Sequence, residues 1–178
     1  MKKIILLAVL AAVQFCSFGQ NTMKFLGIPI DGTKEQMVSA LKNKGYTYDY
    51  KEDWLKGEFN GENVIIQVQT NNNKVYRLAI LDDKFKDETN IKIRYNNLFD
   101  QFLLNGKYIL SGGKRISDEE NISLEMTVGK KRYEAAFIPI DIATNGVVWY
   151  MISSALYGQY RIAMFYENLD NKAKGDDL

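Results

Sequence analysis

Two segments of the chain have apolar residues at the spacing of one helix face. In the longer segment, the apolar side chains recur at i, i+4, i+7, i+8, i+11 and i+12. They are Ile91, Tyr95, Leu98, Phe99, Phe102 and Leu103. Only a period near 3.6 residues gathers these positions on one stripe, so the pattern predicts an amphipathic helix over 89–104.

The shorter helix is predicted over 33–44 from the residues at its start. Thr33 and Gln36 form a capping box, in which each side chain can accept a hydrogen bond from the backbone amide of the other residue. Apolar residues then follow at helical spacing. Gly45 stands where a left-handed residue commonly ends a helix.

Most of the remaining chain alternates between apolar and polar residues, which is typical of half-buried β-strands. The predicted strands lie over 54–59, 62–69, 75–81, 107–111, 122–128, 132–138, 147–154 and 159–166. Between the first two strands, Asn60-Gly61 is typical of a tight hairpin turn. The other connections are also too short for crossovers, so we expect an antiparallel sheet.

The order of these elements predicts the fold class. One helix and about four strands are followed by a second helix and four or five strands. We therefore expect a single α+β domain over 20–167, with two halves of the same plan at 23–82 and 85–167. Both helices need an apolar surface for their stripes, which favours one curved antiparallel sheet covered on one face by two helices. The polar segment 168–178 is predicted to be a flexible tail.

The alternation also assigns side chains to the uncovered face of the sheet. Aromatic and arginine side chains fall there, and such side chains dominate protein interfaces. For the strand over 147–154, the pattern leaves open whether Trp149 or Tyr150 faces this side. The candidate partner-binding residues are Trp54, Arg77, Arg132, Trp149, Tyr150 and Arg161. A merely solvated face and a small-molecule or glycan site are the alternatives, since solvated faces also have scattered aromatics.

A short tyrosine stripe allows two interpretations. Tyr46, Tyr48 and Tyr50 share one face of an extended segment. The stripe suits a buried core face. It also suits an exposed edge on which a sugar or a protein partner stacks.

The first 19 residues have the pattern of a cleavable secretory signal peptide. Lys2 and Lys3 precede an apolar run over 4–13, which is shorter than the roughly 20 residues that cross a bilayer. Small residues stand where a cut after residue 19 needs them, so we expect an exported protein, periplasmic or secreted. An uncleaved anchor and a lipid anchor at Cys16 are the alternatives, although the bulky residue before Cys16 disfavours lipidation.

Composition restricts the chemistry that the exported chain can perform. The chain has no histidine, and its single cysteine, Cys16, leaves with the predicted signal peptide. Disulfides, the usual zinc, copper and haem ligands, and catalysis by histidine or cysteine are thereby excluded. We expect no metal, no cofactor and no catalytic residue. Glu58, Glu125 and Glu134 are expected on the open face, and paired carboxylates can hydrolyse glycosides, but any polar sheet face collects glutamates.

Charge favours neither nucleic acid nor an anionic membrane as partner. Loss of Lys2 and Lys3 with the signal peptide leaves 21 basic and 22 acidic residues, a net charge of −1 without a basic block. No stretch after residue 20 has the length and hydropathy of a transmembrane helix. We therefore expect no nucleic-acid partner and no integral membrane segment after signal cleavage.

Three stretches of sequence and the order of elements resemble known families. Residues 25–37, with a Gly-x-Pro entry into a capped helix, resemble the opening of many exported bacterial proteins, including small outer-membrane lipoproteins of the SmpA/OmlA type. Residues 55–61 and the ending 175–178 resemble segments of exported proteins of the Bacteroides group. The layout is similar to the β-lactamase-inhibitor-protein-like (BLIP-like) fold, which implies two helix-plus-four-strand units in one concave sheet. The disulfides and enzyme-blocking residues of that inhibitor family have no counterpart here, so inhibition of a β-lactamase is not expected.

These patterns together predict a non-catalytic exported binding module that engages a protein partner through the open sheet face. The alternative is a periplasmic or secreted binder of glycans or envelope polymers, or a weak hydrolase. A broad shallow face would favour the first function, and a deep pocket lined by carboxylates would favour the second.

Overall fold

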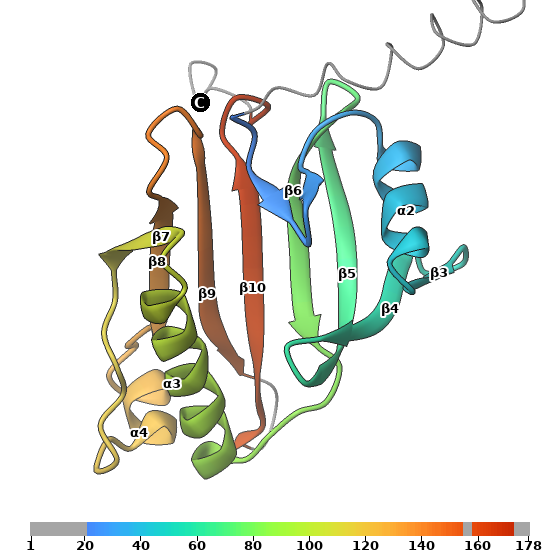
Figure 1. Cartoon of the computed structure of the whole chain (residues 1–178). Coiled ribbons are helices and arrows are strands. Elements are labelled where there is room, and N and C mark those ends of the chain that lie inside the picture. Colours follow the sequence, from blue (N-terminus) through green and yellow to red (C-terminus); the bar gives the residue numbers. More distant parts are fainter. Residues whose placement is uncertain (1–20, 155–157, 173–178) are drawn as a thin grey trace, which may run out of the picture.

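The computed structural model describes residues 21–154 and 158–172 and has an α+β fold (Figure 1). The predicted signal peptide over 1–19, with Cys16, lies outside the described residues, as does the end of the predicted tail. The described chain opens with a hairpin of two short strands, β1 (Lys24–Phe25) and β2 (Ile28–Pro29).

The first half of the chain contains one helix and four strands. Helix α2 (Lys34–Asn43) begins with the predicted capping box, because the Thr33 hydroxyl accepts from the Gln36 amide and the Gln36 side chain accepts from the Thr33 amide. The strands are β3 (Thr47–Asp49), β4 (Trp54–Phe59), β5 (Glu62–Asn71) and β6 (Lys74–Asp82). Asn60 and Gly61 have φ values of 53° and 74°, which fit the expected tight turn between β4 and β5.

The second half begins with the longer helix, α3 (Glu88–Leu104). The Asp87 carboxylate caps it by accepting a hydrogen bond from the Asn90 amide at 2.8 Å. The remaining elements are β7 (Tyr108–Gly112), α4 (Ile122–Thr127), β8 (Glu134–Pro139), β9 (Gly146–Ser154) and β10 (Tyr160–Asn168).

Eight of the strands form one open antiparallel sheet in the order β3-β4-β5-β6-β10-β9-β8-β7. The last strands of the two halves, β6 and β10, therefore pair at the centre of the sheet. Helices α2 and α3 lie over the same face of the sheet, towards its two ends (Figure 1). The predicted α+β class, with one sheet covered on one face by two helices, is confirmed.

The core lies between the sheet and the helices. The predicted apolar stripe of α3 is buried along most of its length, and its rings pack on rings from the sheet. Tyr95 meets Tyr150 edge-on at 5.0 Å between ring centroids, and Phe102 stacks on Phe137 at 4.8 Å. Leu103, which was counted in the stripe, is instead 48% exposed near the end of the helix.

A buried ion pair ties α3 to the first half of the sheet. The Arg94 guanidinium lies 3.3 Å from the Asp82 carboxylate at the end of β6, and it also donates to the carbonyl of Asn60 at 2.9 Å. Burial raises the pKa of Asp82, although the positive charge of Arg94 opposes this rise. Such a pair orients the helix, since an unpaired charge in this place would be costly.

The segment over 122–128, predicted to be a strand, contains the helix α4 instead. The Asn121 side chain caps the helix by accepting from the Leu124 amide at 2.8 Å, and the Glu88 carboxylate accepts from the Ile122 amide at 2.8 Å. A strand over this segment would turn its four alternating apolar side chains, Ile122, Leu124, Met126 and Val128, towards the core. Ile122 is fully buried, whereas Leu124 is 54% exposed, because β8 pairs with β7 and β9 and leaves no place for another strand.

The start of the predicted flexible tail also differs from the prediction. Strand β10 continues to Asn168, whose buried side chain donates to the carbonyl of Ile30 at 2.8 Å. The Asn171 side chain donates to Asp31 and to the carbonyl of Val75. Residues 168–172 therefore hold the chain end against β6 and the turn before α2.

The packing of α3 leads to a test by a matched pair of leucine substitutions. Leu98→Ala should lower the free energy of unfolding by about 2–5 kcal/mol, because the Leu98 side chain is fully buried and its loss leaves a cavity. Leu104→Ala in the same helix should change it by less than about 0.5 kcal/mol, because Leu104 is 86% exposed. Urea denaturation of both variants checks the prediction. An equal decrease in the free energy of unfolding in both variants would show that the buried face of α3 has been misassigned.

Candidate functional site

The face of the sheet opposite the helices presents several cross-strand rows of side chains. One row contains Gln69, Arg77, Glu167 and Val147, and two rows of five residues lie beside it. The first of these two rows crosses five strands and contains Gln67, Ala79, Phe165, Trp149 and Ala136. The neighbouring row contains Ile65, Leu81, Ala163, Met151 and Glu134. Successive residues of a strand point to opposite faces, so both rows point away from the core. The middle of these two rows is thus apolar and aromatic, and each row has a polar side chain, Gln67 or Glu134, at one end.

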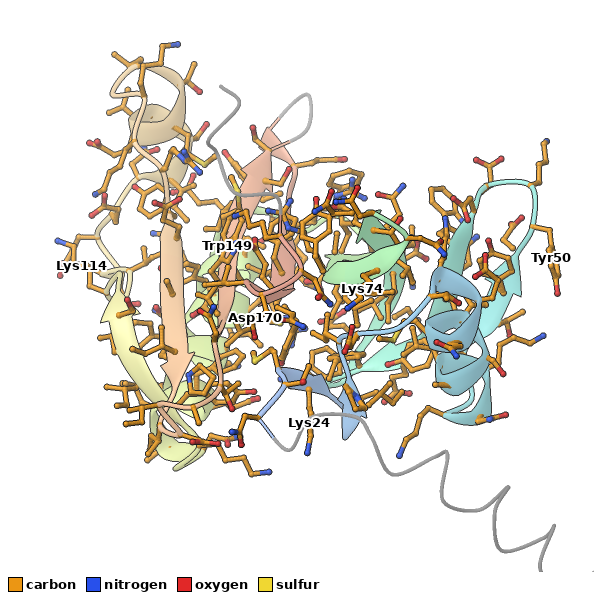
Figure 2. The ribbon with its side chains drawn as sticks, turned by 90° about the horizontal axis from the view of Figure 1, so that it is seen from above. Lys24, Tyr50, Lys74, Lys114, Trp149 and Asp170 are labelled. Carbon is orange, nitrogen blue, oxygen red and sulfur yellow. The ribbon has the colours of Figure 1, made fainter. Side chains whose placement is uncertain are left out.

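Two rings form the centre of the first row. Trp149 on β9 stacks on Phe165 of β10, with 4.2 Å between the ring centroids and 22° between the planes. The Arg77 guanidinium on β6 lies 5.4 Å from the Phe165 centroid and 5.3 Å from that of Tyr76. Figure 2, a view along the strands, shows Trp149 between the two ends of the sheet marked by Lys114 and Tyr50.

Glu167 joins these side chains into one network. Its carboxylate accepts from the Trp149 indole at 2.8 Å and pairs with Arg77 at 2.8 Å and with Lys172 at 3.0 Å. The side chain of Glu167 is only 2% exposed. We call Arg77, Trp149, Phe165, Glu167 and Lys172 the Trp149 cluster.

The electrostatics of the Trp149 cluster keep Glu167 ionised. Burial acts to raise the pKa of Glu167, but the Trp149 hydrogen bond, Lys172 and Arg77 outweigh burial and hold this pKa below its ordinary value. The Nε atom of Arg77 is buried and has no hydrogen-bond partner among the described residues. The contacts of Glu167 with Trp149, Arg77 and Lys172 hold the cluster in one arrangement.

The structure brings two of the predicted residues, Arg77 and Trp149, into this cluster. Arg132 lies beside the same face, exposed, just before β8, and pairs with Glu134 at 3.0 Å. Trp54 is half-buried at the start of β4, four strand spacings or about 19 Å from β9. Arg161 stands near one end of β10 with its guanidinium 5.0 Å from the ring of Phe85. These three residues line the margins of the face, not its centre.

Tyr150 does not belong to the open face. The sequence left open which of Trp149 and Tyr150 points outward, and the structure turns Trp149 out and Tyr150 in. Tyr150 is fully buried, and its hydroxyl donates to the carbonyl of Tyr95 at 3.2 Å. It is a core residue that helps to hold α3.

Three members of the Trp149 cluster, Phe165, Glu167 and Lys172, were not among the candidate residues from the sequence. Glu167 lies one residue beyond the predicted end of the last strand, and Lys172 lies in the predicted tail. Continuing the alternation Ala163, Phe165 by two residues would have placed Glu167 on the open face. The ion pair of Lys172 depends on how the chain end folds back, which no local pattern encodes.

The three glutamates expected on the open face do not form a catalytic group. Glu125 lies in α4 and not on a strand, so that part of the prediction was wrong. Glu58 on β4 and Glu134 on β8 are five strand spacings apart, about 24 Å. Glycosidase carboxylates lie within about 10 Å of each other. Among the described residues, no His, Cys, Asp and Glu side chains gather into a group of three that could hold a metal ion.

The fold and this face define an α+β protein with an open antiparallel sheet whose uncovered side presents a preformed aromatic and arginine cluster. Comparison with known proteins finds no matching family model, no matching curated protein and no matching solved structure. Within the described part of the chain, no helix has both the length and the apolar character needed to cross a bilayer.

The Trp149 cluster leads to a prediction about acid stability. Glu167→Gln should lower the free energy of unfolding by about 1–3 kcal/mol at neutral pH, because the charge-assisted contacts to Arg77 and Lys172 are lost. The pKa of Glu167 is lower in the folded chain than its ordinary value of 4.5, so its stabilisation is complete above that value and is lost as the pH falls through the folded pKa. The difference in free energy of unfolding between wild type and variant, measured by urea denaturation, should therefore shrink below about pH 4.5.

Glu58→Gln serves as the control for this experiment. Glu58 is exposed on the same face, and the substitution makes the same change in charge. It should alter the free energy of unfolding by less than about 0.5 kcal/mol. If the difference in free energy of unfolding between wild type and Glu167→Gln increased on acidification, the assigned network would be contradicted.

Proposed function

We propose that this protein is a non-catalytic binding module that engages a protein partner through the open face of its sheet. The observation on which the proposal depends is the Trp149 cluster. Its stacked rings and arginine lie at the centre of an uncovered face, with polar and charged side chains at the margins. Protein interfaces commonly have this arrangement of an aromatic and arginine centre inside a polar rim.

The rigidity of the cluster supports the same function. Binding energy is lost when side chains must be ordered at an interface. The contacts of Glu167 with Trp149, Arg77 and Lys172 order these side chains in advance. The width of the face also suits a macromolecular partner, since eight strands at a spacing of about 4.8 Å span about 34 Å.

We place this binding outside the cytoplasm, in the periplasm or in the medium. The proposal follows from the predicted signal peptide. The BLIP-like resemblance supports a similar mode of binding, because in each half of the chain a helix precedes four strands of the same sheet. The partner itself is proposed to be a protein, since neither the charge nor the open face favours nucleic acid.

A second candidate function is binding of a glycan or envelope polymer at the β3 end of the sheet. Tyr50 is 80% exposed, and its ring meets that of Tyr48 edge-on at 4.8 Å. Exposed rings of this kind can stack on a sugar. Tyr46, the remaining residue of the stripe, is buried against Gly57 and does not contribute to such a site.

Site-specific photo-crosslinking in the producing cell tests the proposed function. A benzophenone amino acid at Gln67, exposed on the open face, should give a discrete protein adduct. The same probe at Lys42, exposed on α2 over the other face, should not. Adducts from Lys42 alone, or none from either position, would contradict the proposal.

Two substitutions then separate the candidate functions. Trp149→Ala should reduce the Gln67 adduct more than tenfold, because truncation of a central aromatic residue typically costs about 2 kcal/mol or more in binding. Tyr50→Ala should leave the adduct unchanged and abolish any binding on a glycan array. Thermal unfolding of both variants shows that they are folded. Loss of the adduct in Tyr50→Ala alone would favour the second candidate.

A further inference from the structure

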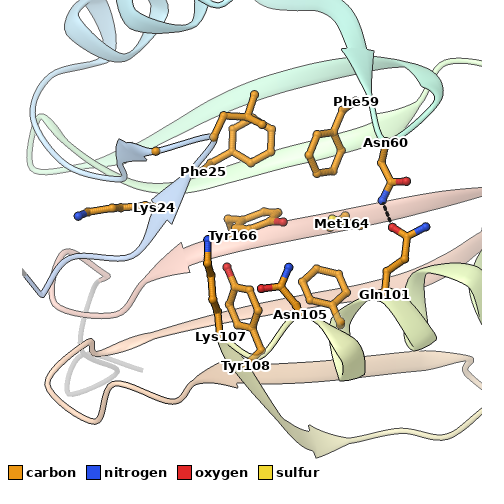
Figure 3. A pocket seen from close by; sticks show the side chains of 13 residues that line it. Lys24, Phe25, Phe59, Asn60, Gln101, Asn105, Lys107, Tyr108, Met164 and Tyr166 are labelled. Carbon is orange, nitrogen blue, oxygen red and sulfur yellow. Dashed lines mark hydrogen bonds between the residues drawn. The ribbon is translucent and has the colours of Figure 1, made fainter.

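A groove opens on the helix side of the sheet, between the β1–β2 hairpin and the end of α3 (Figure 3). Its volume is about 570 Å³, which lies within the usual range of about 300–1,000 Å³ for small-molecule sites. In Figure 3, Phe25 and Phe59 stand on one side and Asn105, Lys107 and Tyr108 on the other.

Five aromatic side chains line the groove: Phe25, Phe59, Phe102, Tyr108 and Tyr166. Phe25 lies 5.0 Å from Phe59 and 5.1 Å from Tyr166, measured between ring centroids. Across the groove, the ring of Phe102 lies 5.4 Å from that of Tyr108. Such a surface suits an apolar chain, because it offers contact area and little competition from water.

The charge of the groove has one sign. Lys24 and Lys107 line it, and no acidic side chain does. Neither lysine forms an ion pair with a described residue, and both are exposed. The nearby end of α3 contributes a partial negative charge of about 0.5, which is smaller than the charge of the two ammonium groups. The groove therefore favours an anion.

The side chain of Tyr166 adds a hydroxyl-bearing ring to the lining of the groove. Tyr166 is 6% exposed and lines the groove beside Met164. Burial raises the pKa of Tyr166 and of Tyr108, so both remain neutral and can donate their O–H.

We propose that this groove binds a single-chain amphiphilic anion, with the hydrocarbon chain along the rings and the head group near Lys24 and Lys107. The groove is separate from the open face, because Met164 and Tyr166 alternate along β10 with Phe165 and Glu167 of the Trp149 cluster. The side chain of Asn60 donates to Gln101 at 2.6 Å across one end of the groove. This hydrogen bond closes that end and limits the length of the hydrocarbon chain that the groove can hold.

Isothermal titration calorimetry tests the proposal. The chain without its predicted signal peptide is titrated with decanoate, decyl phosphate and 1-decanol, each below its critical micelle concentration. At least one anion should bind saturably with one site, and 1-decanol should bind about tenfold more weakly or worse. Tighter binding of decyl phosphate would indicate a lipid-derived phosphate as the natural head group, and tighter binding of decanoate a free fatty acid. Octanoate should bind about fifteenfold more weakly than decanoate, because two buried methylenes are removed.

Paired variants locate the binding site. Lys24→Gln with Lys107→Gln should weaken binding of the anion about tenfold or more and leave 1-decanol unaffected. Lys44→Gln with Lys51→Gln removes the same charge from two exposed lysines outside the groove and should leave binding unchanged. Absence of saturable binding to the wild type, equal affinity for 1-decanol, or equal losses in both double variants would overturn the proposal. Trp149→Ala should bind decanoate normally, so failure of the proposed function leaves this result intact.

Discussion

The antiparallel pairing of β6 with β10 is the interaction on which the rest of the structure depends. It joins strands about 80 residues apart in the chain, with Leu81 opposite Ala163 and Leu78 opposite Tyr166. Closing so long a loop is entropically costly, and the burial of one continuous core offsets that cost. Because the pairing places both halves in one sheet, both helices cover the same face, and the other face is left open.

This pairing also puts two different surfaces on the two sides of β10. Phe165 and Glu167 point to the open face, where they join Trp149 and Arg77. Met164 and Tyr166 point to the helix side, where α2 and α3 stand apart and the β1–β2 hairpin only partly fills the gap. One strand thus supports a rigid polar and aromatic cluster on one side and an apolar groove on the other.

Buried ion pairs fix the positions of helices and strands that apolar packing alone would hold less specifically. Arg94 holds α3 to the end of β6 through Asp82, and it holds the β4–β5 turn through the carbonyl of Asn60. Glu167 plays the same part at the opposite end of β10 for Arg77 and the chain end. The carboxylates of Asp82 and Glu167 are almost fully buried, so the loss of their cationic partners would leave a poorly solvated charge.

Local spacing was enough to predict part of the fold and of the candidate site. The capping box at Thr33, the stripe beginning at Ile91 and the Asn60-Gly61 turn are each encoded within a few residues, and all but the Leu103 end of the stripe occurs as predicted. The outward position of Arg77 followed from the period of a strand. The helix α4 was mistaken for a strand because its residues alternate, and its true form depends on a cap by Asn121 and an anchor from the distant Glu88.

The sequence by itself determined the class of the fold, the two helices and most strands, because helix and strand periods act over neighbouring residues. Only the tertiary structure decided that Trp149 and not Tyr150 faces out, that Glu167 is buried among three partners, and that two lysines line the same groove as five aromatic side chains. Those features depend on which strands lie side by side. Strand order is set by the total apolar area that the assembled sheet and helices remove from water, and no short segment contains that information.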